Sequence, residues 1–538
     1  MNALLLVAFA IIVFVIAYVT YGAWLCKKWG VDSNRKTPAY TKSDGVDYVP
    51  ASSAVLLGHH FASIAGAGPI VGPIAAAIFG WIPVILWIII GGIFFGGVQD
   101  FGSLFASIRH DGKSVGQIIE ANIGKTGKKL FSIFAWLTLL LVVAAFVNIV
   151  ASTFVKVPQA ATASILFIIL AIVFGFAVYR KGVSLALGSI AGVLLLFVCI
   201  WLGMRFPISL GLNTWIALLL GYIFIASVTP VWILLQPRDY LNSFLLYAMM
   251  AGSVIGLLMY RPSLQLAAYN GFNVNGTYLF PMLFVIVACG AISGFHSLVG
   301  SGTSSKQISN EKDAKLVGYG GMLIECVLAV IALITAGYVG ADKLKELLAG
   351  GGPVNVFSDG VGTFMTSIGI PMEVGKPFVA LAISAFALTS LDTATRLGRF
   401  ILQEFFEDDT KETQSILATN RFVSTAITVV IGGLLAVVGW SKVWPLFGAS
   451  NQLLGAIALL AMAVWMTNIG KSNKMFIYPM IFMFAVTLTA LVLLIKGNMA
   501  SGNFILVVLG IALFILALIL IYQAYSVLRK KGKKSLKA

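Results

Sequence analysis

Charged residues are scarce in this chain. Only 10% of its 538 residues are Asp, Glu, Lys or Arg, whereas 59% are hydrophobic. A soluble domain carries roughly 25% charged residues, so the composition excludes a soluble globular protein and predicts an integral membrane protein within a lipid bilayer. The 36 Lys and Arg residues outnumber the 20 Asp and Glu residues, which fits the basic loops of such a protein. This balance gives no reason to expect a nucleic-acid partner.

Cysteine and histidine are rarer still, with four residues of each. The cysteines Cys26, Cys199, Cys289 and Cys326 show no metal-binding spacing, and we interpret them as small apolar residues. The phosphate-binding motif GxxxxGK[ST] and the metalloprotease motif HExxH are both missing. We therefore expect neither an enzyme nor primary active transport, no ATPase subunit as a partner, and no required cofactor.

Long apolar runs dominate what is present. A helix needs about 20 apolar residues to cross the hydrocarbon core, and the hydropathy pattern predicts about fifteen such segments. We therefore expect an all-α polytopic bundle. The segments lie near 2–25, 52–79, 81–108, 130–153, 162–179, 183–204, 214–235, 239–259, 278–298, 315–339, 374–395, 422–439, 443–468, 475–495 and 503–528.

The basic residues are distributed asymmetrically between the connections. Most of the 36 Lys and Arg residues follow odd-numbered segments or lie in the C-terminal tail RKKGKKSLK. This asymmetry predicts an outside N-terminus and a cytoplasmic C-terminus. Segment 341–373 is amphipathic and then rich in glycine. We expect either an external lid-like loop or half-helix there, or a plain surface connector.

Two predicted helices contain helix-breaking residues. The second breaks at Gly66, Ala67, Gly68 and Pro69, and the seventh at Thr229–Pro230. Gly and Pro are frequent in membrane helices generally. Irregular backbone at membrane depth is nevertheless tolerated only where it is buried in protein or lines a cavity, and its free amide and carbonyl groups can bind ions or substrate.

The two breaks lie five segments apart in helices of opposite orientation. This pattern predicts two five-helix repeats of inverted topology, each beginning with a discontinuous helix. The expected organisation is an extra N-terminal helix in 1–30, a first repeat in 51–205, a second repeat in 213–406, and accessory helices with a basic tail in 418–538.

Several ionisable residues lie inside the predicted helices, all in the cytoplasmic half of the bilayer. They are His59, His60, Asp100, His296, Glu325 and Asp392. Three interpretations compete: side chains that reach the interface or are structurally paired, a proton relay, and a metal site of the zinc type.

The metal interpretation would use His59, His60 and His296. Adjacent histidines point about 100° apart on a helix, so His59 and His60 could share one ion only if the helix unwinds there. The sequence leaves the relay and the metal site open. It also leaves open a structural role for the paired histidines.

Five longer motifs resemble the carbon starvation protein A family: GHHFASIAGAGPIVGP, VTPVWILLQPRDYL, CGAISGFHSLVGSGTSSKQ, LDTATRLGRF and WPLFGASNQLL. The resemblance implies a bacterial or archaeal inner-membrane transporter related to the amino acid–polyamine–cation transporters, with a five-plus-five fold of the LeuT type. Family members are implicated in peptide uptake during nutrient limitation, and relatives resemble proton-coupled pyruvate importers. The family motifs fall on His59, His60 and Gly66–Pro69, on Thr229–Pro230 with Gln236, and on His296 with Ser297.

We therefore expect a secondary active importer of small peptides, linked to carbon starvation and coupled to H⁺ or Na⁺. The expected substrate site comprises Gly66, Ala67, Gly68, Pro69, Thr229, Pro230 and Gln236. The expected coupling site comprises His59, His60, Asp100, His296, Ser297 and Asp392. A symporter of pyruvate or another small monocarboxylate is the alternative in the same class. A membrane nutrient sensor is the alternative in another class, and an intramembrane metalloenzyme ranks last.

Overall fold

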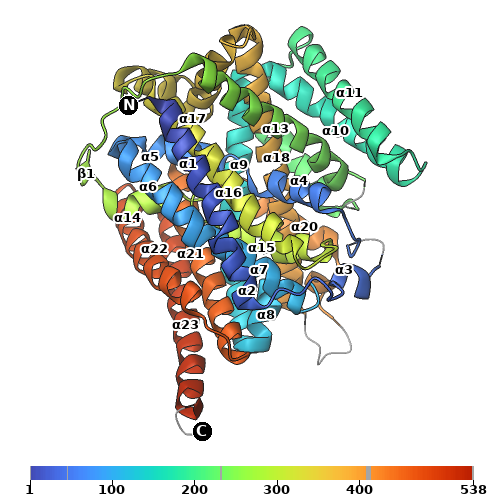
Figure 1. Ribbon diagram of the computed structural model, residues 1–538, viewed down its shortest axis with the longest axis vertical. Helices are drawn as coiled ribbons and strands as arrows, with labels where there is room; N and C mark the ends of the chain where they lie inside the picture. Colours follow the sequence, from blue (N-terminus) through green and yellow to red (C-terminus); the bar gives the residue numbers. More distant parts are fainter. Residues whose placement is uncertain (1, 45–46, 231–232, 408–413, 536–538) are drawn as a thin grey trace.

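The computed structural model describes residues 2–44, 47–230, 233–407 and 414–535. Figure 1 shows an elongated bundle of helices with the two chain ends at opposite ends of the long axis. Helices dominate because the apolar runs are long, and a chain in lipid must satisfy its backbone hydrogen bonds within each segment.

Eleven helices in the described part of the chain are long and apolar enough to cross a membrane. The chain is therefore a multi-pass membrane protein. The eleven are formed by α1 (Ala3–Val19) with α2 (Tyr21–Trp29), α6 (Trp81–Gly91) through α7 (Gly97–Arg109), α9 (Lys125–Lys156), α10 (Pro158–Tyr179), α11 (Leu185–Arg205), α13 (Leu235–Tyr260), η4 (Lys315–Gly320) with α16 (Gly321–Gly337), α18 (Met372–Phe406), α21 (Trp440–Asn468), α22 (Lys474–Ala500) and α23 (Phe504–Ser535).

Shorter elements complete the bundle and its loops. The apolar ones are α4 (Ser53–Ile64), α5 (Gly68–Ala76), α12 (Leu212–Val228), α14 (Leu279–Ile286), α15 (Gly294–Gly302) and α20 (Arg421–Ala436). The remaining ones are α3 (Pro38–Thr41), η1 (Ala77–Phe79), η2 (Gly92–Gly96), α8 (Val115–Asn122), η3 (Ser304–Lys306), α17 (Ala341–Thr366), α19 (Ile416–Thr419) and an antiparallel hairpin of β1 (Asn273–Val274) and β2 (Thr277–Tyr278).

Two long helices, α9 and α18, form the middle of the bundle. α9 has 32 residues and α18 has 35, and they pack against each other along much of their length. α12 and α20 pack against both of them. α10 and α11 form a hairpin at the edge of the molecule (Figure 1). Leu187, Ile190 and Leu194 of α11 are exposed, as expected for a face in contact with lipid.

Segment 341–373 is largely the helix α17, with a sharp kink at Gly351–Gly352. Gly352 has φ +71°, a left-handed conformation that glycine adopts without strain. The half after the kink is buried against neighbouring helices, and α17 packs against α5, α13, α16 and α18. A Cβ built on Gly360 would lie 2.6 Å from Thr335. The segment is therefore part of the packed bundle, not a plain surface connector.

Candidate functional site

The first helix break lies where the sequence predicts it. α4 ends at Ile64, α5 begins at Gly68, and the two helices are bent by 47°. A Cβ built on Gly66 would lie 2.6 Å from Ser390 Oγ and 2.7 Å from a ring carbon of Phe146. Glycine is therefore required at this position by close packing as well as by the break.

The second break lies elsewhere than predicted. Thr229 and Pro230 follow the end of α12 and lie in the connection to α13, so they do not interrupt a helix. The second interruption separates α14 from α15, over residues 287–293. The prediction at Thr229–Pro230 was wrong because proline commonly ends a membrane helix as well as breaking one.

Polar side chains of α21 bind the open backbone of the second break. Asn451 accepts a hydrogen bond from the amide of Phe295 (2.9 Å) and donates one to Ser293 Oγ (3.0 Å). The neighbouring Gln452 donates to the carbonyls of Phe284 and Val287. These bonds satisfy backbone groups that lipid could not satisfy.

The two interrupted helices meet near their breaks. A Cβ built on Gly68 would lie 2.5 Å from Cys289 Sγ, and one on Gly72 would lie 2.7 Å from the carbonyl oxygen of Ile286. Glycine at 68 and 72 therefore allows α5 to lie directly against the end of α14 and the residues that follow it. Irregular backbone from both halves of the chain is thereby gathered in one buried region.

Three ionisable residues from separate helices meet beside this region. His296 Nδ1 of α15 lies 2.8 Å from Asp100 Oδ2 of α7, and its Nε2 lies 3.4 Å from Glu325 Oε2 of α16. All three side chains are buried. We call Asp100, His296 and Glu325 the His296 triad. The sequence identifies each residue as intramembrane but gives no sign that they touch.

Both carboxylates of the triad follow a π-helical turn. η2 ends four residues before Asp100, and η4 ends five residues before Glu325. η4 packs closely against α7, because a Cβ on Gly318 of η4 would lie 2.8 Å from the Cα of Phe101 in α7. π-helical turns often mark functional sites in otherwise regular helices. Here they occur where the triad is assembled.

The adjacent histidines of α4 face different partners. His59 Nδ1 lies 3.4 Å from Asp239 Oδ2 of α13. His60 Nδ1 lies 2.7 Å from Ser304 Oγ, and a Cβ on Gly321 would lie 3.5 Å from its ring. α4 remains helical here, so the two imidazoles diverge as the 100° rotation per residue requires.

This divergence counts against the metal site predicted from His59, His60 and His296. No group of three or more His, Cys, Asp or Glu residues in the described part of the chain is arranged to hold a metal ion. His296 has carboxylate neighbours of its own, while His59 is directed at α13. The three histidines therefore do not form a ligand set.

A second buried charge cluster joins α12, α13 and α18. Arg238 donates to Asp239 Oδ1 (3.0 Å), to the Tyr222 hydroxyl (2.6 Å) and to Asp392 Oδ2. The Tyr222 hydroxyl also donates to Asp392 (2.7 Å). We call Tyr222, Arg238, Asp239 and Asp392 the Arg238 network, and His59 lies against it through Asp239. Of these residues, sequence analysis singled out only Asp392 and His59.

Each cluster has one more carboxylate than it has cationic groups when His296 is protonated. In the triad, Asp100 and Glu325 share one imidazole, and neither pairs with a Lys or Arg of the described residues. In the Arg238 network, two carboxylates share one guanidinium. An unbalanced buried charge is costly. Each cluster can reach neutrality by binding one further proton, on a triad carboxylate or on His59.

A cavity lies beside His59 and beside Asp47, a residue of the connection before α4. It measures about 40 Å³ and is lined by residues that include Ser63, Gln236, Lys306 and Arg396. Gln236 thus lies beside His59, close to the first break, as the sequence predicts for a substrate-binding residue. Arg396 also donates to the carbonyls of Ala226 and Thr229 at the end of α12, which explains why this helix end tolerates free carbonyls.

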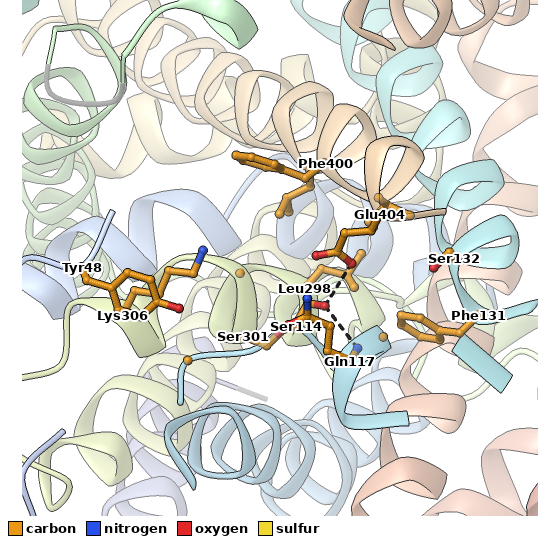
Figure 2. Close-up of a pocket in the computed structure, with 15 residues that line it drawn as sticks. Tyr48, Ser114, Gln117, Phe131, Ser132, Leu298, Ser301, Lys306, Phe400 and Glu404 are labelled. Atoms are coloured by element: carbon orange, nitrogen blue, oxygen red, sulfur yellow. Dashed lines mark hydrogen bonds between the residues drawn. The ribbon is translucent and has the colours of Figure 1, made fainter. Parts of the chain in front are cut away.

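A larger cavity of about 200 Å³ adjoins it (Figure 2). The two cavities share four lining residues, Gly302, Lys306, Leu397 and Phe400. Tyr48 lines the larger one, and burial together with nearby aspartates raises the pKa of its hydroxyl above the usual range. This hydroxyl therefore stays protonated at neutral pH.

Ser297 has a local role in the structure. Its hydroxyl donates to the carbonyl of Gly294 one turn earlier in α15 (2.6 Å), and its backbone carbonyl accepts from Ser301 (2.7 Å). The other predicted substrate residues, Ala67 and Pro69, are buried at the first break. The structure thus gathers His59, Asp392 and Gln236 on one side of α4, and His60 with the His296 triad on the other.

Comparison with solved structures finds the same fold in a metal-ion transporter. The Eremococcus coleocola manganese transporter, in complex with an aromatic bis-isothiourea compound, matches with a TM-score of 0.54 at 12% identity. The match covers 90% of this chain and 99% of that protein. At this identity the likeness concerns the fold alone.

Comparison of sequences is more specific. The peptide transporter CstA of Escherichia coli K12 is 33% identical over 91% of this chain and 80% of its own length. The CstA of Campylobacter jejuni is 34% identical over 90% and 79%. The pyruvate/proton symporter BtsT of Escherichia coli K12 is 31% identical over 88% and 79%. Residues 2–350 and 340–490 match the family described as carbon starvation protein CstA. The chain belongs to the carbon starvation protein CstA family.

Proposed function

We propose that this chain is a secondary active importer of small peptides that moves a proton with its substrate. The observation that carries the proposal is the meeting of two interrupted helices beside two buried clusters, each short of one positive charge. Open backbone at the breaks suits a polar substrate. The unbalanced clusters suit a transported proton. The names of the relatives support both parts, since several are peptide transporters and one is a pyruvate/proton symporter.

The transport cycle would use an inverted repeat of the LeuT type with about fifteen membrane spans. The eleven long helices, the pair α4/α5, the pair α14/α15, and the shorter α12 and α20 supply these spans. The second break favours repeat boundaries different from those expected from Thr229–Pro230. One repeat would run from α4 to α13 and the other from α14 to α21, with the α10–α11 hairpin as an insertion.

Three pairings support these boundaries. Each half begins with an interrupted helix. Each interrupted helix is followed by a span with a π-helical turn, η2 or η4. The long helices α9 and α18 then take equivalent places and pack against each other. In such a fold the substrate binds between the interrupted helices and the long helices, with access alternating between the two sides.

Coupling would depend on the divergent histidines of α4. His60 lies beside Gly321, in the helix that carries Glu325, whereas His59 reaches the Arg238 network. A movement of α4 relative to its neighbours therefore changes both charge clusters together. We expect the coupling ion to be H⁺ rather than a metal ion, and we expect transport without a resident cofactor or enzymatic step.

The bacterial relatives favour an inner membrane, and the basic loops favour a C-terminus in the cytoplasm. In this orientation Asp47 and Lys306 lie in cytoplasmic connections, and both line the cavity beside His59. The cavity offers a route by which a proton and a substrate leave. A pyruvate symporter is the second candidate, favoured by the 31% identity to BtsT.

Uptake by purified protein in liposomes tests the proposal. We expect labelled dialanine to accumulate when the outside is acidified, with little response to a sodium gradient. His296→Gln should reduce this uptake at least about tenfold because the triad loses its titratable centre. His110→Gln is the matched control, because the His110 ring binds the carbonyl of Ala106 in its own helix region (2.7 Å) and packs edge-to-face against Trp465.

The outcomes separate the candidates. Accumulation of pyruvate but not of any dipeptide would replace the proposed substrate with the second candidate. Equal loss of uptake in His296→Gln and His110→Gln would remove the assigned role of the triad. Uptake that ignores the proton gradient would contradict coupling altogether.

A further inference from the structure

The two cavities differ in charge. The smaller is lined by Arg396 and Lys306, with Asp47 as the acidic residue among its lining. The larger is lined by Glu404 and the hydroxyl groups of Tyr48 and Ser114. We call these two cavities the smaller lobe and the larger lobe. The lining of the smaller lobe thus carries an excess of positive charge. The part of the larger lobe distant from Lys306 carries a negative one.

One face of α18 connects the lobes. Arg396, Phe400 and Glu404 follow each other at intervals of four residues, so they lie on one side of the helix. Phe400 lines both cavities, whereas Arg396 lines only the smaller and Glu404 only the larger. Eight residues of helix span roughly 12 Å. The helix therefore holds a cation and an anion at a fixed spacing, with an aromatic ring between them.

Both charged groups retain unused hydrogen-bonding capacity. Arg396 Nε is buried and finds no acceptor among the described residues, although the guanidinium also donates to Ala226 and Thr229. Glu404 accepts a hydrogen bond from Ser114 at Oε2 (3.2 Å). Figure 2 shows its carboxylate directed into the cavity, toward Ser114. The Ser114 hydroxyl also caps α8 by accepting from Gln117, which holds it in place.

We propose that these lobes form a release-side binding site for a short peptide with free ends, its carboxylate at Arg396 and Lys306 and its ammonium group at Glu404. This inference rests on the proposed function and names how its substrate is recognised. An extended chain spans at most 3.3–3.6 Å per residue. Three or four residues, about 10–14 Å, therefore match the spacing along α18. Pyruvate and single amino acids are too short to reach both ends.

The direction of the bound peptide follows from the position of each lobe. The smaller lobe, which holds Arg396, reaches His59 and Ser63 of α4, next to the first break. The larger lobe, which holds Glu404, lies near the end of α18. The carboxylate therefore lies deeper in the molecule and the amino end nearer its surface. Phe400 between them packs against the middle of the peptide, which makes the site tolerant of side-chain identity.

Binding to the full-length protein in detergent tests the inference independently of transport. Calorimetry with trialanine, N-acetyl-trialanine and trialanine amide measures the contribution of each end. In the wild type, we expect each modification to weaken binding about tenfold or more, because a charge-assisted hydrogen bond is lost. Trialanine and tetraalanine should bind more tightly than dialanine or hexaalanine.

Variants assign each end to its lobe. Glu404→Gln should weaken trialanine binding and abolish the preference for a free amino end, while keeping the preference for a free carboxylate. Lys306→Gln should do the reverse, and it avoids the structural bonds that Arg396 makes to α12. Glu373→Gln, an exposed change at the opposite end of α18, is the matched control and should alter neither preference.

Three results would overturn the inference: equal binding of free and N-acetylated trialanine by the wild type, an unchanged amino-end preference in Glu404→Gln, or no peptide binding at all. Its failure is distinguishable from failure of the proposed function. If peptides bind with the expected end preferences but show no proton-driven uptake in liposomes, the proposed importer function is contradicted and the proposed binding site stands. Uptake with no preference for free ends contradicts the site and leaves the importer.

Discussion

Gly68 and Cys289 place the two interrupted helices in direct contact. A Cβ built on Gly68 would lie 2.5 Å from the sulfur of Cys289 and 2.6 Å from its Cβ. Contacts this short cannot be accommodated without moving one of the helices. The close approach of the two breaks therefore depends on the absence of a side chain at Gly68, and not on the backbone freedom of glycine.

We predict that Gly68→Ala destabilises the protein by about 1–3 kcal/mol, the usual range for overpacking, and reduces transport. Thermal unfolding in detergent measures the first effect and liposome uptake the second. Cys289→Gly in the same chain should restore part of both, because it removes the two atoms that clash. Gly221→Ala is the control, since a Cβ there meets nothing within 4 Å. No rescue by Cys289→Gly would show that another contact limits position 68.

The sequence predicts the first break and the buried ionisable residues well, for a simple physical reason. A charge or a Gly-Pro cluster is conspicuous in an apolar run, because lipid offers it no compensation. His59, Asp100, His296 and Asp392 are recognised in this way. Their pairing is not recognised, since it depends on which helices cross, and the crossing is set by glycines such as Gly318 that contact a distant helix.

Two other features escape sequence reasoning. Arg238 falls between the predicted segments 214–235 and 239–259, and Asp239 is the first residue of the second, where a charged pair is typical of a loop. In the structure they lie in the first turns of α13 and are buried. The second break contains no proline and is marked only by small residues around Gly290. The stronger Thr229–Pro230 signal therefore attracts the prediction to a helix end.

Asn451 should be essential for the second break. We predict that Asn451→Ala destabilises the protein by about 1–3 kcal/mol, because the amide of Phe295 and the hydroxyl of Ser293 lose a partner in a buried region. Thermal unfolding in detergent measures the change. Asn498→Ala is the matched control, because Asn498 donates to a carbonyl of its own helix (2.9 Å). Similar losses in the two variants would contradict a special role for Asn451.

Arg238 balances part of the charge of Asp239 and Asp392. We predict that Arg238→Met destabilises the protein by about 3–5 kcal/mol, since it leaves two buried carboxylates without a cation. Adding Asp392→Asn should recover much of this loss, because it removes one of the two charges. Thermal unfolding of the single and double variants measures the coupling between the residues.

An exposed ion pair provides the comparison for this cycle. Lys343 and Glu346 are 2.7 Å apart on the surface of α17, where water screens the charges. Lys343→Met should leave the unfolding temperature unchanged. If Arg238→Met behaved like Lys343→Met, the network would contribute nothing to stability. If Asp392→Asn gave no recovery, the contribution of Arg238 to the stability of the protein would come from its contacts with Asp239 or Tyr222 instead.

Glu325→Gln separates coupling from substrate binding. With glutamine at 325, the triad keeps one carboxylate and one imidazole, so a protonated His296 already balances Asp100. The cluster then has no excess charge for a transported proton to neutralise. We predict that accumulation driven by a proton gradient falls at least about tenfold, whereas exchange of labelled for unlabelled dipeptide changes by less than about threefold. Exchange needs the substrate to cross but needs no net proton movement.

Glu373→Gln, exposed at the far end of α18, should leave both activities intact. Loss of exchange together with accumulation would place Glu325 in substrate binding or folding. Retention of both would assign the coupling proton to the other cluster, where His59 lies against Asp239.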